Sequence, residues 1–415
     1  MYELIKGRLM AVRFILLIAT LTLVAIGIIA IYSVGHPLLY SPAYQAENWS
    51  IFWKKQLVFA IIGLAGFIAV NLINYRRFGA ISLWIYASVL MLLGLLLVSR
   101  FIVSIPFIPE INGTHAWIKL KVAGRDLPAV QPSEICKIAY ILALAWYLRY
   151  RSNYRNFSAL IGPFVLTLLP MVLILLEPDL GTVMLMMPVF FTMLFFAGAK
   201  VKHLLTIILF ALIVSPLFWH KMEPYQRTRI SSVLLQNTWL RQKAELYPTI
   251  SKILVGRKFS AKQWENDWGY HLTRSKFAVA SGGFSGYGFR HGPFITYNFL
   301  TYRHNDFIFA IIAHQWGFLG CLLLLGLYAI IIACGLEIAV QNTDPFGRLL
   351  ATGIVAMFTV EVLINVSMTV GLMPITGLTL PLVSYGGSSL LISMMSIGLL
   401  NNVGRRRPFS VARKT

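Results

Sequence analysis

Residues 307–334 read FIFAIIAHQWGFLGCLLLLGLYAIIIAC, an apolar run of 28 residues without a single Asp, Glu, Lys or Arg. About 20 such residues suffice for a helix to cross a hydrocarbon core of about 30 Å. Nine more apolar runs occur along the chain, at residues 11–34, 57–74, 80–103, 133–148, 158–176, 180–198, 202–218, 346–371 and 382–403. With 58% hydrophobic residues, 12% charged residues and a mean hydropathy of +0.72, the composition lies outside the range of soluble domains. We expect an all-α polytopic membrane protein with about ten transmembrane helices.

The runs predict one membrane domain over residues 1–415, with a long outer loop at about 219–305 between spans seven and eight. The first run is too long for the apolar core of a signal peptide, so we expect a retained helix. Short loops on one side carry most of their charge as Lys and Arg, which is typical of the cytoplasmic side and predicts cytoplasmic N- and C-termini. These cations are Arg8, Arg13, Arg76, Arg77, Arg149, Arg151, Arg155, Lys200, Lys202 and 405–407. Lys54, Lys55, Lys119, Lys121 and Arg125 fall on the opposite side and are exceptions to the rule.

The net charge of +21 does not indicate nucleic-acid binding, because the cations border membrane runs and form no soluble basic domain. The outer loop alone contains 13 Lys and Arg. Cations that face outward suggest an anionic ligand such as a phosphate-bearing lipid, or a surface that pairs with anionic headgroups without catalysis. The three cysteines, Cys136, Cys321 and Cys334, lie inside apolar runs with no metal-binding spacing, so we expect them to pack as small apolar residues.

Asp306 stands directly before the 307–334 run, at the end of the sequence Tyr302-Arg303-His304-Asn305-Asp306. The chain has only 15 Asp and Glu residues, so a carboxylate at a membrane boundary needs a physical reason. One reason is a helix N-terminus, where free backbone N–H groups favour an anion and Asp can act as the N-cap. The other is catalysis, with Asp306 as a general base at the edge of a lipid-facing active site.

Two further charged clusters interrupt apolar sequence. Glu134 and Lys137 lie three residues apart and share a helix face, and Glu177-Pro178-Asp179 separates runs five and six. With the N-terminus in the cytoplasm, both clusters lie toward the outer side. A charge at membrane depth is costly unless it is paired, so we expect an ion pair between Lys137 and Asp179, with Glu134 beside it. A structural and a functional pair would look alike in sequence.

A set of motifs in fixed order gives the chain a resemblance to the SEDS family (shape, elongation, division and sporulation), which includes RodA and FtsW. The motifs are 112–118 (NGTHAWI), 131–134 (QPSE), Lys137, 177–182 (EPDLGT), 224–227 (PYQR), Gly282-Gly283, 306–310 (DFIFA), 371–377 (GLMPITG) and 384–389 (SYGGSS). The resemblance extends from the first run to the tenth.

This resemblance implies a membrane glycosyltransferase that polymerises lipid II into peptidoglycan strands and releases undecaprenyl pyrophosphate. It also implies a bacterial cytoplasmic (inner) membrane location with the active site on the outer side. Its implied partners are a class B penicillin-binding protein transpeptidase and other membrane proteins of the elongation complex. The turn Ile375-Thr376-Gly377 is more similar to the elongation branch, represented by RodA, whereas Thr379 is more typical of the division branch, represented by FtsW.

The implied reaction suits the charged residues. Asp306 is the candidate catalytic base for a sugar hydroxyl. The leaving pyrophosphate gathers negative charge, which Arg, Lys or a bound divalent cation such as Mg²⁺ can stabilise. The candidate substrate-binding residues are Lys137, Arg227, Arg229, Arg274, Arg303, Trp117 and Ser384. Since the lipid tail must stay in the bilayer, we expect an apolar groove beside spans eight to ten.

Several positions depart from the family pattern. Thr301-Tyr302 replaces Pro-Glu, His314-Gln315 replaces a pair of Glu residues, Tyr287 stands for a Lys, and Arg274 for a Gln. Segment 231–268 is longer than usual, and its fold is open. Two other functions also remain open, a flippase for lipid-linked cell-wall precursors and a scaffold without catalytic activity. Polymerisation of supplied lipid II by the purified protein separates the enzyme from both.

Overall fold

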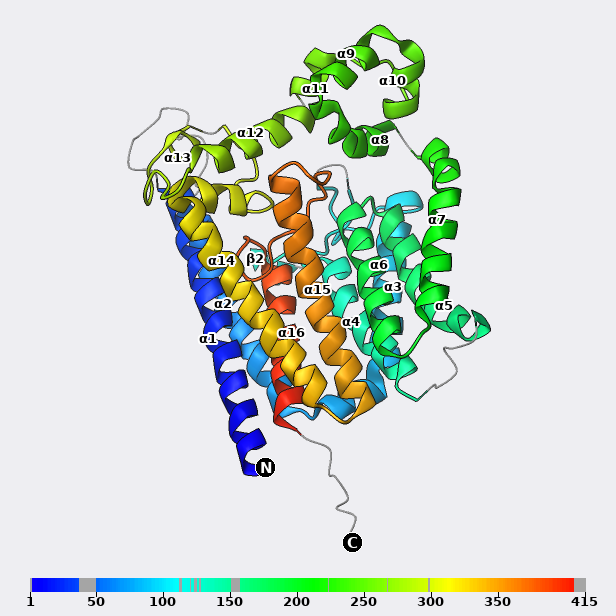
Figure 1. Ribbon diagram of the computed structural model, residues 1–415, viewed down its shortest axis with the longest axis vertical. Helices are drawn as coiled ribbons and strands as arrows, with labels where there is room; N and C mark the ends of the chain where they lie inside the picture. Colours follow the sequence, from blue (N-terminus) through cyan, green and yellow to red (C-terminus); the bar gives the residue numbers. More distant parts are fainter. Residues whose placement is uncertain are drawn as a thin grey trace.

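The structure is a computed structural model that describes residues 2–36, 50–111, 114–119, 121–122, 125–126, 128–150, 157–222, 224–266, 268–297 and 299–406. Within these residues, each of the ten predicted runs forms a helix (Figure 1). The helices are α1 (Tyr2–Gly35), α2 (Ser50–Leu72), α3 (Tyr75–Phe101), α4 (Pro132–Leu148), α5 (Ile161–Leu176), α6 (Leu180–Phe196), α7 (Val201–Lys221), α14 (Ile308–Gln341), α15 (Pro345–Thr369) and α16 (Gly387–Arg405).

The prediction of an all-α membrane fold is confirmed. Helices α1, α2, α3, α14 and α15 are long and apolar enough to cross a membrane, and α5, α6 and much of α7 are shorter apolar helices. That all ten cross the membrane stays a prediction. The first turn of α1 and the last turn of α16 lie at the same end of the bundle, which agrees with an even number of crossings (Figure 1). Arg151, Arg155 and Arg407, three of the cations that predict the cytoplasmic side, lie outside the described residues.

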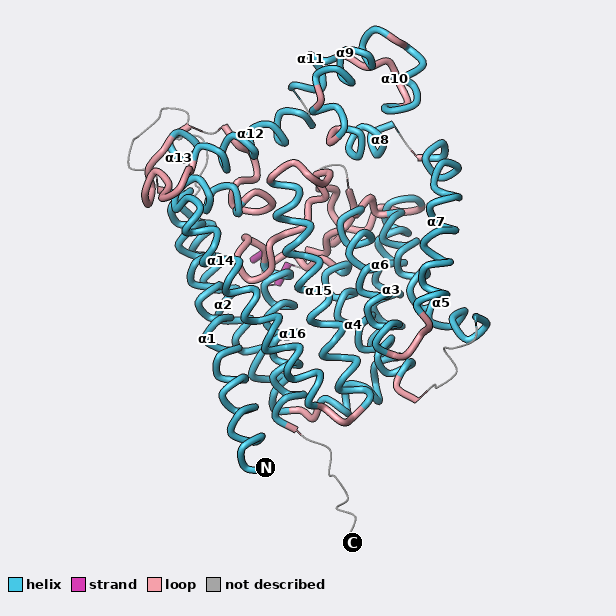
Figure 2. The backbone as a smooth tube through the Cα atoms, in the orientation of Figure 1, coloured by secondary structure: helices cyan, strands magenta, loops and turns pink. Residues whose placement is uncertain are grey.

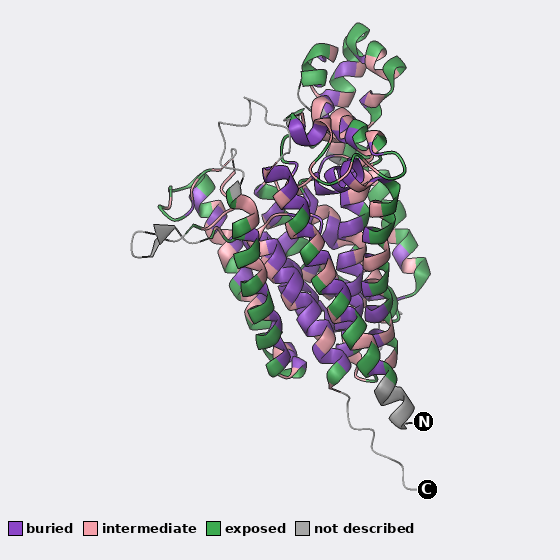
Figure 3. Ribbon diagram, turned by 90° about the vertical axis from the view of Figure 1, so that its left-hand side faces the viewer, coloured by how far each residue is buried: buried purple, intermediate pink, exposed green. Residues whose placement is uncertain are grey.

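Helices α4 and α15 form the centre of the bundle. Most of their side chains are buried, because each packs against several neighbours, whereas outer helices such as α2 and α3 expose apolar faces. Figure 3 shows the buried residues concentrated in the inner helices. Helix α15 contacts α14 on one side and α4 and α6 on the other, and α16 packs along α2. An apolar exposed surface is the surface expected toward lipid, since lipid chains are as apolar as the side chains.

The outer loop between α7 and α14 folds mainly into short helices. Helices α8 (Pro224–Ser231), α9 (Thr238–Leu246), α10 (Pro248–Val255) and α11 (Ala261–Asn266), with the 3₁₀ turn η3 (Leu234–Gln236), form a small lobe above the bundle (Figures 1 and 2). Its core consists of Leu235, Ala244, Val255, Phe259 and Trp264. Helices α12 (Trp268–Ser281) and α13 (Pro293–Thr296) lead from the lobe back to α14. Most of segment 231–268 therefore has a core of its own.

Two irregular segments lie at the lobe end of the bundle (Figure 2). Residues 370–386 form turns, so α16 begins five residues later than the predicted run at 382. In the described part of the segment between α3 and α4, two short strands, β1 (Lys121–Val122) and β2 (Arg125–Asp126), pair in antiparallel fashion. Asn112 and Gly113 of the motif at 112–118 lie outside the described residues. The 3₁₀ turn η2 (Phe157–Leu160) precedes α5.

Candidate active site

Asp306 lies in the turn between α13 and α14, and it does not cap a helix. Helix α14 begins at Ile308 with Phe307 at the N-cap position, and no side chain accepts a bond from its first turn. The N-cap interpretation of Asp306 is therefore wrong. Its Oδ1 atom is buried and has no hydrogen-bond partner among the described residues. A buried carboxylate oxygen without a donor is costly, which makes a structural role a poor explanation for Asp306.

One cation from the outer lobe approaches this carboxylate. Both groups lie next to Gly377. A Cβ atom added to this glycine would lie 3.7 Å from Nη2 of Arg229, on α8, and 3.9 Å from Oδ2 of Asp306. Burial raises the pKa of Asp306 from its usual 3.8 to about 6, and the positive charge of Arg229 opposes that rise. Asp306 thus titrates close to neutral pH, as a general base should.

The neighbouring His304 adds no positive charge at neutral pH. Burial, and next to it the charge of Arg303, lowers the pKa of His304 to about 4. Its ring stacks on Phe52 at 4.5 Å and lies edge-on to Tyr385 at 5.5 Å. His304 is therefore neutral at neutral pH, and its ring packs against Phe52 and Tyr385.

Two predicted substrate-binding residues, Arg303 and Ser384, bond to backbone carbonyls. Arg303 is completely buried, and its Nη1 donates to the carbonyls of Phe294 and Ile295 at 3.1 and 3.3 Å. Ser384 is 4% exposed, and its hydroxyl donates to the carbonyl of Asn305 at 2.7 Å. The Arg303 side chain thus joins the Asp306 turn to α13, and the Ser384 side chain bonds to the residue before Asp306.

A polar cavity of about 280 Å³ lies next to the Asp306 turn. Its wall combines the first turns of α4 and α6 with the loop that leads into α16. Trp117, Glu134 and Asp179, three of the predicted site residues, line it together. Asn305 and Gly377 line it as well, which places the cavity directly beside Asp306 and Arg229.

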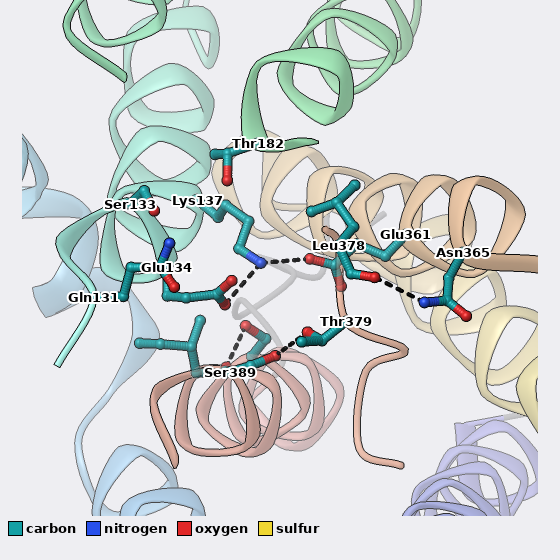
Figure 4. Close-up of polar contacts among 12 residues, drawn as sticks. Gln131, Ser133, Glu134, Lys137, Thr182, Glu361, Asn365, Leu378, Thr379 and Ser389 are labelled. Carbon is teal, nitrogen blue, oxygen red and sulfur yellow. Dashed lines mark hydrogen bonds and ion pairs between the residues drawn. The ribbon is translucent and has the colours of Figure 1, made fainter. Parts of the chain in front are cut away.

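The predicted ion pair between Lys137 and Asp179 is wrong. Lys137 Nζ lies 2.7 Å from Glu134 and 2.7 Å from Glu361 on α15, between the two carboxylates (Figure 4). Asp179 instead caps α6 and accepts from the backbone N–H of Thr182 at 3.0 Å and from the hydroxyl of Ser133 at 2.9 Å. The N-cap position satisfies its charge locally, so it does not need the lysine. Glu361 was missed, although it is a lone acid inside the run 346–371.

The remaining predicted cations, Arg227 and Arg274, are not among the residues that line the cavity. Arg227 Nε donates to the carbonyl of Met222 at 3.1 Å, and its guanidinium packs beside Gly256 of the lobe. Arg274 lies over the rings of Tyr270 and Phe299, 5.2 Å from each centroid. Of the four candidate arginines, only Arg229 is brought to Asp306.

Three other lysines lie near the cavity, and the sequence argument had not considered them as site residues. Lys54, Lys55 and Lys119 line a cleft of about 560 Å³ that shares Phe59, Ala129 and Tyr385 with the polar cavity. All three were exceptions to the charge bias of the loops. This departure from the charge bias could have identified them as site residues from the sequence, because an outward-facing cation near a membrane can bind an anionic ligand.

An apolar groove of about 420 Å³ continues from the same cavity between α2, α4 and α16. It shares Phe59, Ala129, Gly387 and Ser388 with the cavity, and Ile62, Leu391 and Met395 are among its apolar side chains. The groove was expected beside spans eight to ten, and only α16 of those helices contributes. A second groove of about 360 Å³ lies between α1 and α14, lined by Ile26, Trp316 and Leu319 among others.

Two residues that depart from the family pattern, His314 and Gln315, are packed inside the protein. His314 Nδ1 lies 2.7 Å from the Ser281 hydroxyl, and Gln315 Nε2 donates to the Ser33 hydroxyl at 2.8 Å. Both side chains are completely buried, so they replace charged residues with bonded neutral ones. Tyr302 sits at a tight turn with φ of 55°.

The cavity does not resemble a protein-held metal site. No group of three or more His, Cys, Asp or Glu side chains able to hold a metal ion occurs among the described residues. Glu134 already pairs with Lys137, and Asp179 already accepts four hydrogen bonds, from Gln131, Ser133 and Thr182.

Known proteins resemble the chain over nearly its full length. The profile of a family of cell cycle proteins named for FtsW, RodA and SpoVE matches residues 13–408. The peptidoglycan glycosyltransferase RodA of Treponema pallidum is 31% identical over 95% of this chain and 98% of that protein. A probable peptidoglycan glycosyltransferase FtsW of Trichlorobacter lovleyi is 32% identical over 95% of this chain and 94% of that one.

A solved structure has the same architecture. It comes from work on the structural coordination of polymerization and crosslinking by a peptidoglycan synthase complex, and it is 28% identical to this chain with a TM-score of 0.70. The match covers 94% of this chain and 96% of that one.

Proposed function

The chain belongs to the FtsW, RodA and SpoVE family of cell cycle proteins, and we propose that it is a peptidoglycan glycosyltransferase acting in cell elongation and shape. Its substrate is lipid II, which it polymerises into glycan strands with release of undecaprenyl pyrophosphate. The observation that carries this proposal is the carboxylate of Asp306 beside Arg229, next to Asn305 and Gly377 in the wall of a polar cavity that runs into an apolar groove.

In the proposed reaction, Asp306 accepts the proton of the 4-hydroxyl of the acceptor sugar. That oxygen forms a bond to the anomeric carbon of the donor, and the bond from this carbon to the pyrophosphate breaks. The electron pair leaves on the lipid pyrophosphate. Pyrophosphate leaves without a strong protonating acid, so one base suffices and a second carboxylic acid is not needed.

The positions of the cations suit an anionic leaving group. Arg229 stands beside the base, and Lys54, Lys55 and Lys119 line the cleft that adjoins the cavity. Placed there, they can stabilise the negative charge that develops on the pyrophosphate. Lys137 is buried between two carboxylates, so its part in the proposal is to hold the cavity wall. A divalent cation such as Mg²⁺ would enter with the pyrophosphate oxygens and not through a protein site.

The remaining proposals concern context. The protein lies in the bacterial cytoplasmic (inner) membrane with both termini in the cytoplasm and the active site outside. Its partners are a class B penicillin-binding protein transpeptidase and other membrane proteins of the elongation complex, supported by the likeness to a peptidoglycan synthase complex. RodA and FtsW relatives match at 31% and 32% identity, so the elongation branch rests on the turn Ile375-Thr376-Gly377.

The test is glycan-strand synthesis by the purified chain from supplied lipid II, comparing wild type with Asp306→Asn. Asn keeps the size of the side chain and removes its basicity, so synthesis should fall by roughly a hundredfold or more. Asp344→Asn is the control, because Asp344 lies in the turn before α15 at the opposite end, 2.8 Å from the hydroxyl of Tyr75. Normal synthesis by folded Asp306→Asn would remove the base from the mechanism. Lipid II transfer between leaflets without strand synthesis would favour a flippase.

A further inference from the structure

The turn that carries Asp306 is held through its backbone. Three consecutive carbonyls, those of His304, Asn305 and Asp306, each accept a hydrogen bond from the last part of the chain. The donors are the backbone N–H of Tyr385 at 3.0 Å, the Ser384 hydroxyl at 2.7 Å and the Asn365 side-chain amide at 3.0 Å. Oδ1 of Asp306 has no such bond among the described residues, so these backbone bonds help to set where the carboxylate lies.

Asn365 makes the bond that lies closest to the carboxylate. It is completely buried in α15, and its Nδ2 donates to the carbonyl of Leu378 at 2.7 Å as well as to that of Asp306. Both amide hydrogens are then in use. Figure 4 shows the amide of Asn365 directed at the Leu378 carbonyl. Since Gly377 and Leu378 line the polar cavity, one side chain fixes Asp306 relative to the cavity wall.

We infer that Asn365 is a positioning residue for the reaction. It holds the turn so that the Asp306 carboxylate lies next to the part of the cavity where the acceptor hydroxyl must bind. This inference rests on the proposed function of Asp306. A base works only within hydrogen-bond reach of the proton that it removes, and a displacement of 1 Å can cost about a hundredfold in rate. Asn365 is completely buried and its amide donates to two backbone carbonyls, so it acts through Asp306 and not on the substrate.

A purely structural role would give a different result, and the chain offers a matched control. Asn402 in α16 is also completely buried, and its Nδ2 donates to the carbonyls of Val70 and Ile73 at 2.7 and 2.5 Å. The Oδ1 atoms of both asparagines are buried without a hydrogen bond among the described residues. The two side chains therefore make equivalent hydrogen bonds, one beside Asp306 and the other at the opposite end of the bundle.

The experiment compares Asn365→Leu with Asn402→Leu in the full-length chain. Leu has nearly the shape of Asn and donates no hydrogen bond, so both variants should lose a similar amount of thermal stability. Strand synthesis is then measured against lipid II concentration, below the melting temperature of both variants. Asn365→Leu should lower kcat by about tenfold to a hundredfold with KM within about twofold of wild type, whereas Asn402→Leu should retain its kcat.

Three outcomes would count against the inference. An equal loss of kcat in both variants, or a loss confined to KM, would overturn it while leaving the proposed function intact. No strand synthesis by wild type would overturn the proposed function and the inference with it. If Asn365→Leu does not fold, Asn365→Ser and Asn402→Ser replace the pair, because Ser is smaller and keeps one donor.

Discussion

At the residue scale, the carboxyl of Asp306 predicts how activity depends on pH. With its pKa raised to about 6 by burial, the base is ionised at neutral pH and protonated below 6. Strand synthesis at low lipid II, where the rate follows kcat/KM, should therefore fall about tenfold for each pH unit below that value. The check is the pH profile of kcat/KM for wild type, with the residual activity of Asp306→Asn as the control. A wild-type profile that stays flat from pH 7 to pH 5 would contradict the assignment.

The same residue should reduce stability. Its folded-state pKa is about 6 against 3.8 unfolded, so the folded chain binds more protons between these values, and stability falls as pH rises through that window. The full difference amounts to about 3 kcal/mol. Asp306→Asn should therefore be more stable than wild type at pH 7 and about equal to it below pH 4. Glu177, whose pKa burial raises to about 8, also affects the pH curve of wild type. Because both proteins carry Glu177, their difference in melting temperature isolates Asp306.

The sequence located Asp306 because acids are rare in this chain and this one borders an apolar run. It could not separate an N-cap from a base, since the two differ by where α14 begins, at Ile308, and that is a matter of backbone geometry. Arg303 shows the same limit. Sequence proximity suggested a phosphate contact, but its guanidinium is turned inward to the carbonyls of Phe294 and Ile295.

At the element scale, the charges of α4 and α15 predict how the centre of the bundle is held. Lys137 joins Glu134 in its own helix to Glu361 in α15. Lys137→Met should cost about 3–5 kcal/mol of stability, because it leaves two buried carboxylates without their cation. The double variant Lys137→Met/Glu361→Gln should recover part of that loss, since one of the stranded charges is removed.

The control for this triad is Asp179→Asn. Asn also accepts hydrogen bonds at an N-cap, so the loss of thermal stability should be small in comparison. A loss as large as that of Lys137→Met would restore the pair between Lys137 and Asp179. The sequence placed Lys137 and Glu134 on one face through their spacing. It could not choose between Asp179 and Glu361 as partner, because spacing says nothing about which helices pack together.

At the scale of the whole molecule, ten apolar runs predicted ten helices, and the structure has a helix at each. Periodicity and length suffice for that, since a helix in lipid must satisfy its own backbone. The sequence could not show which helices pack against each other, and so the groove was expected beside spans eight to ten. Instead, α16 lies along α2. Just before α16, the backbone N–H of Gly386 donates to the side chain of Gln56 in α2, 330 positions earlier in the chain. Such long-range pairing leaves no local pattern in the sequence.

That packing creates two candidate paths for the lipid tail, and a bulky side chain in each distinguishes them. Leu391 lines the groove between α2, α4 and α16, which joins the polar cavity, whereas Leu319 lines the groove between α1 and α14 and shares no residue with that cavity. Leu391→Trp should raise KM for lipid II by at least about tenfold, since two lost CH₂ contacts at about 0.8 kcal/mol each have that effect. Leu319→Trp should leave KM unchanged. The measurement is strand synthesis against lipid II concentration, with melting temperatures to establish folding. A rise in KM for Leu319→Trp alone would place the tail between α1 and α14, because only the groove that the prenyl chain occupies is sensitive to filling.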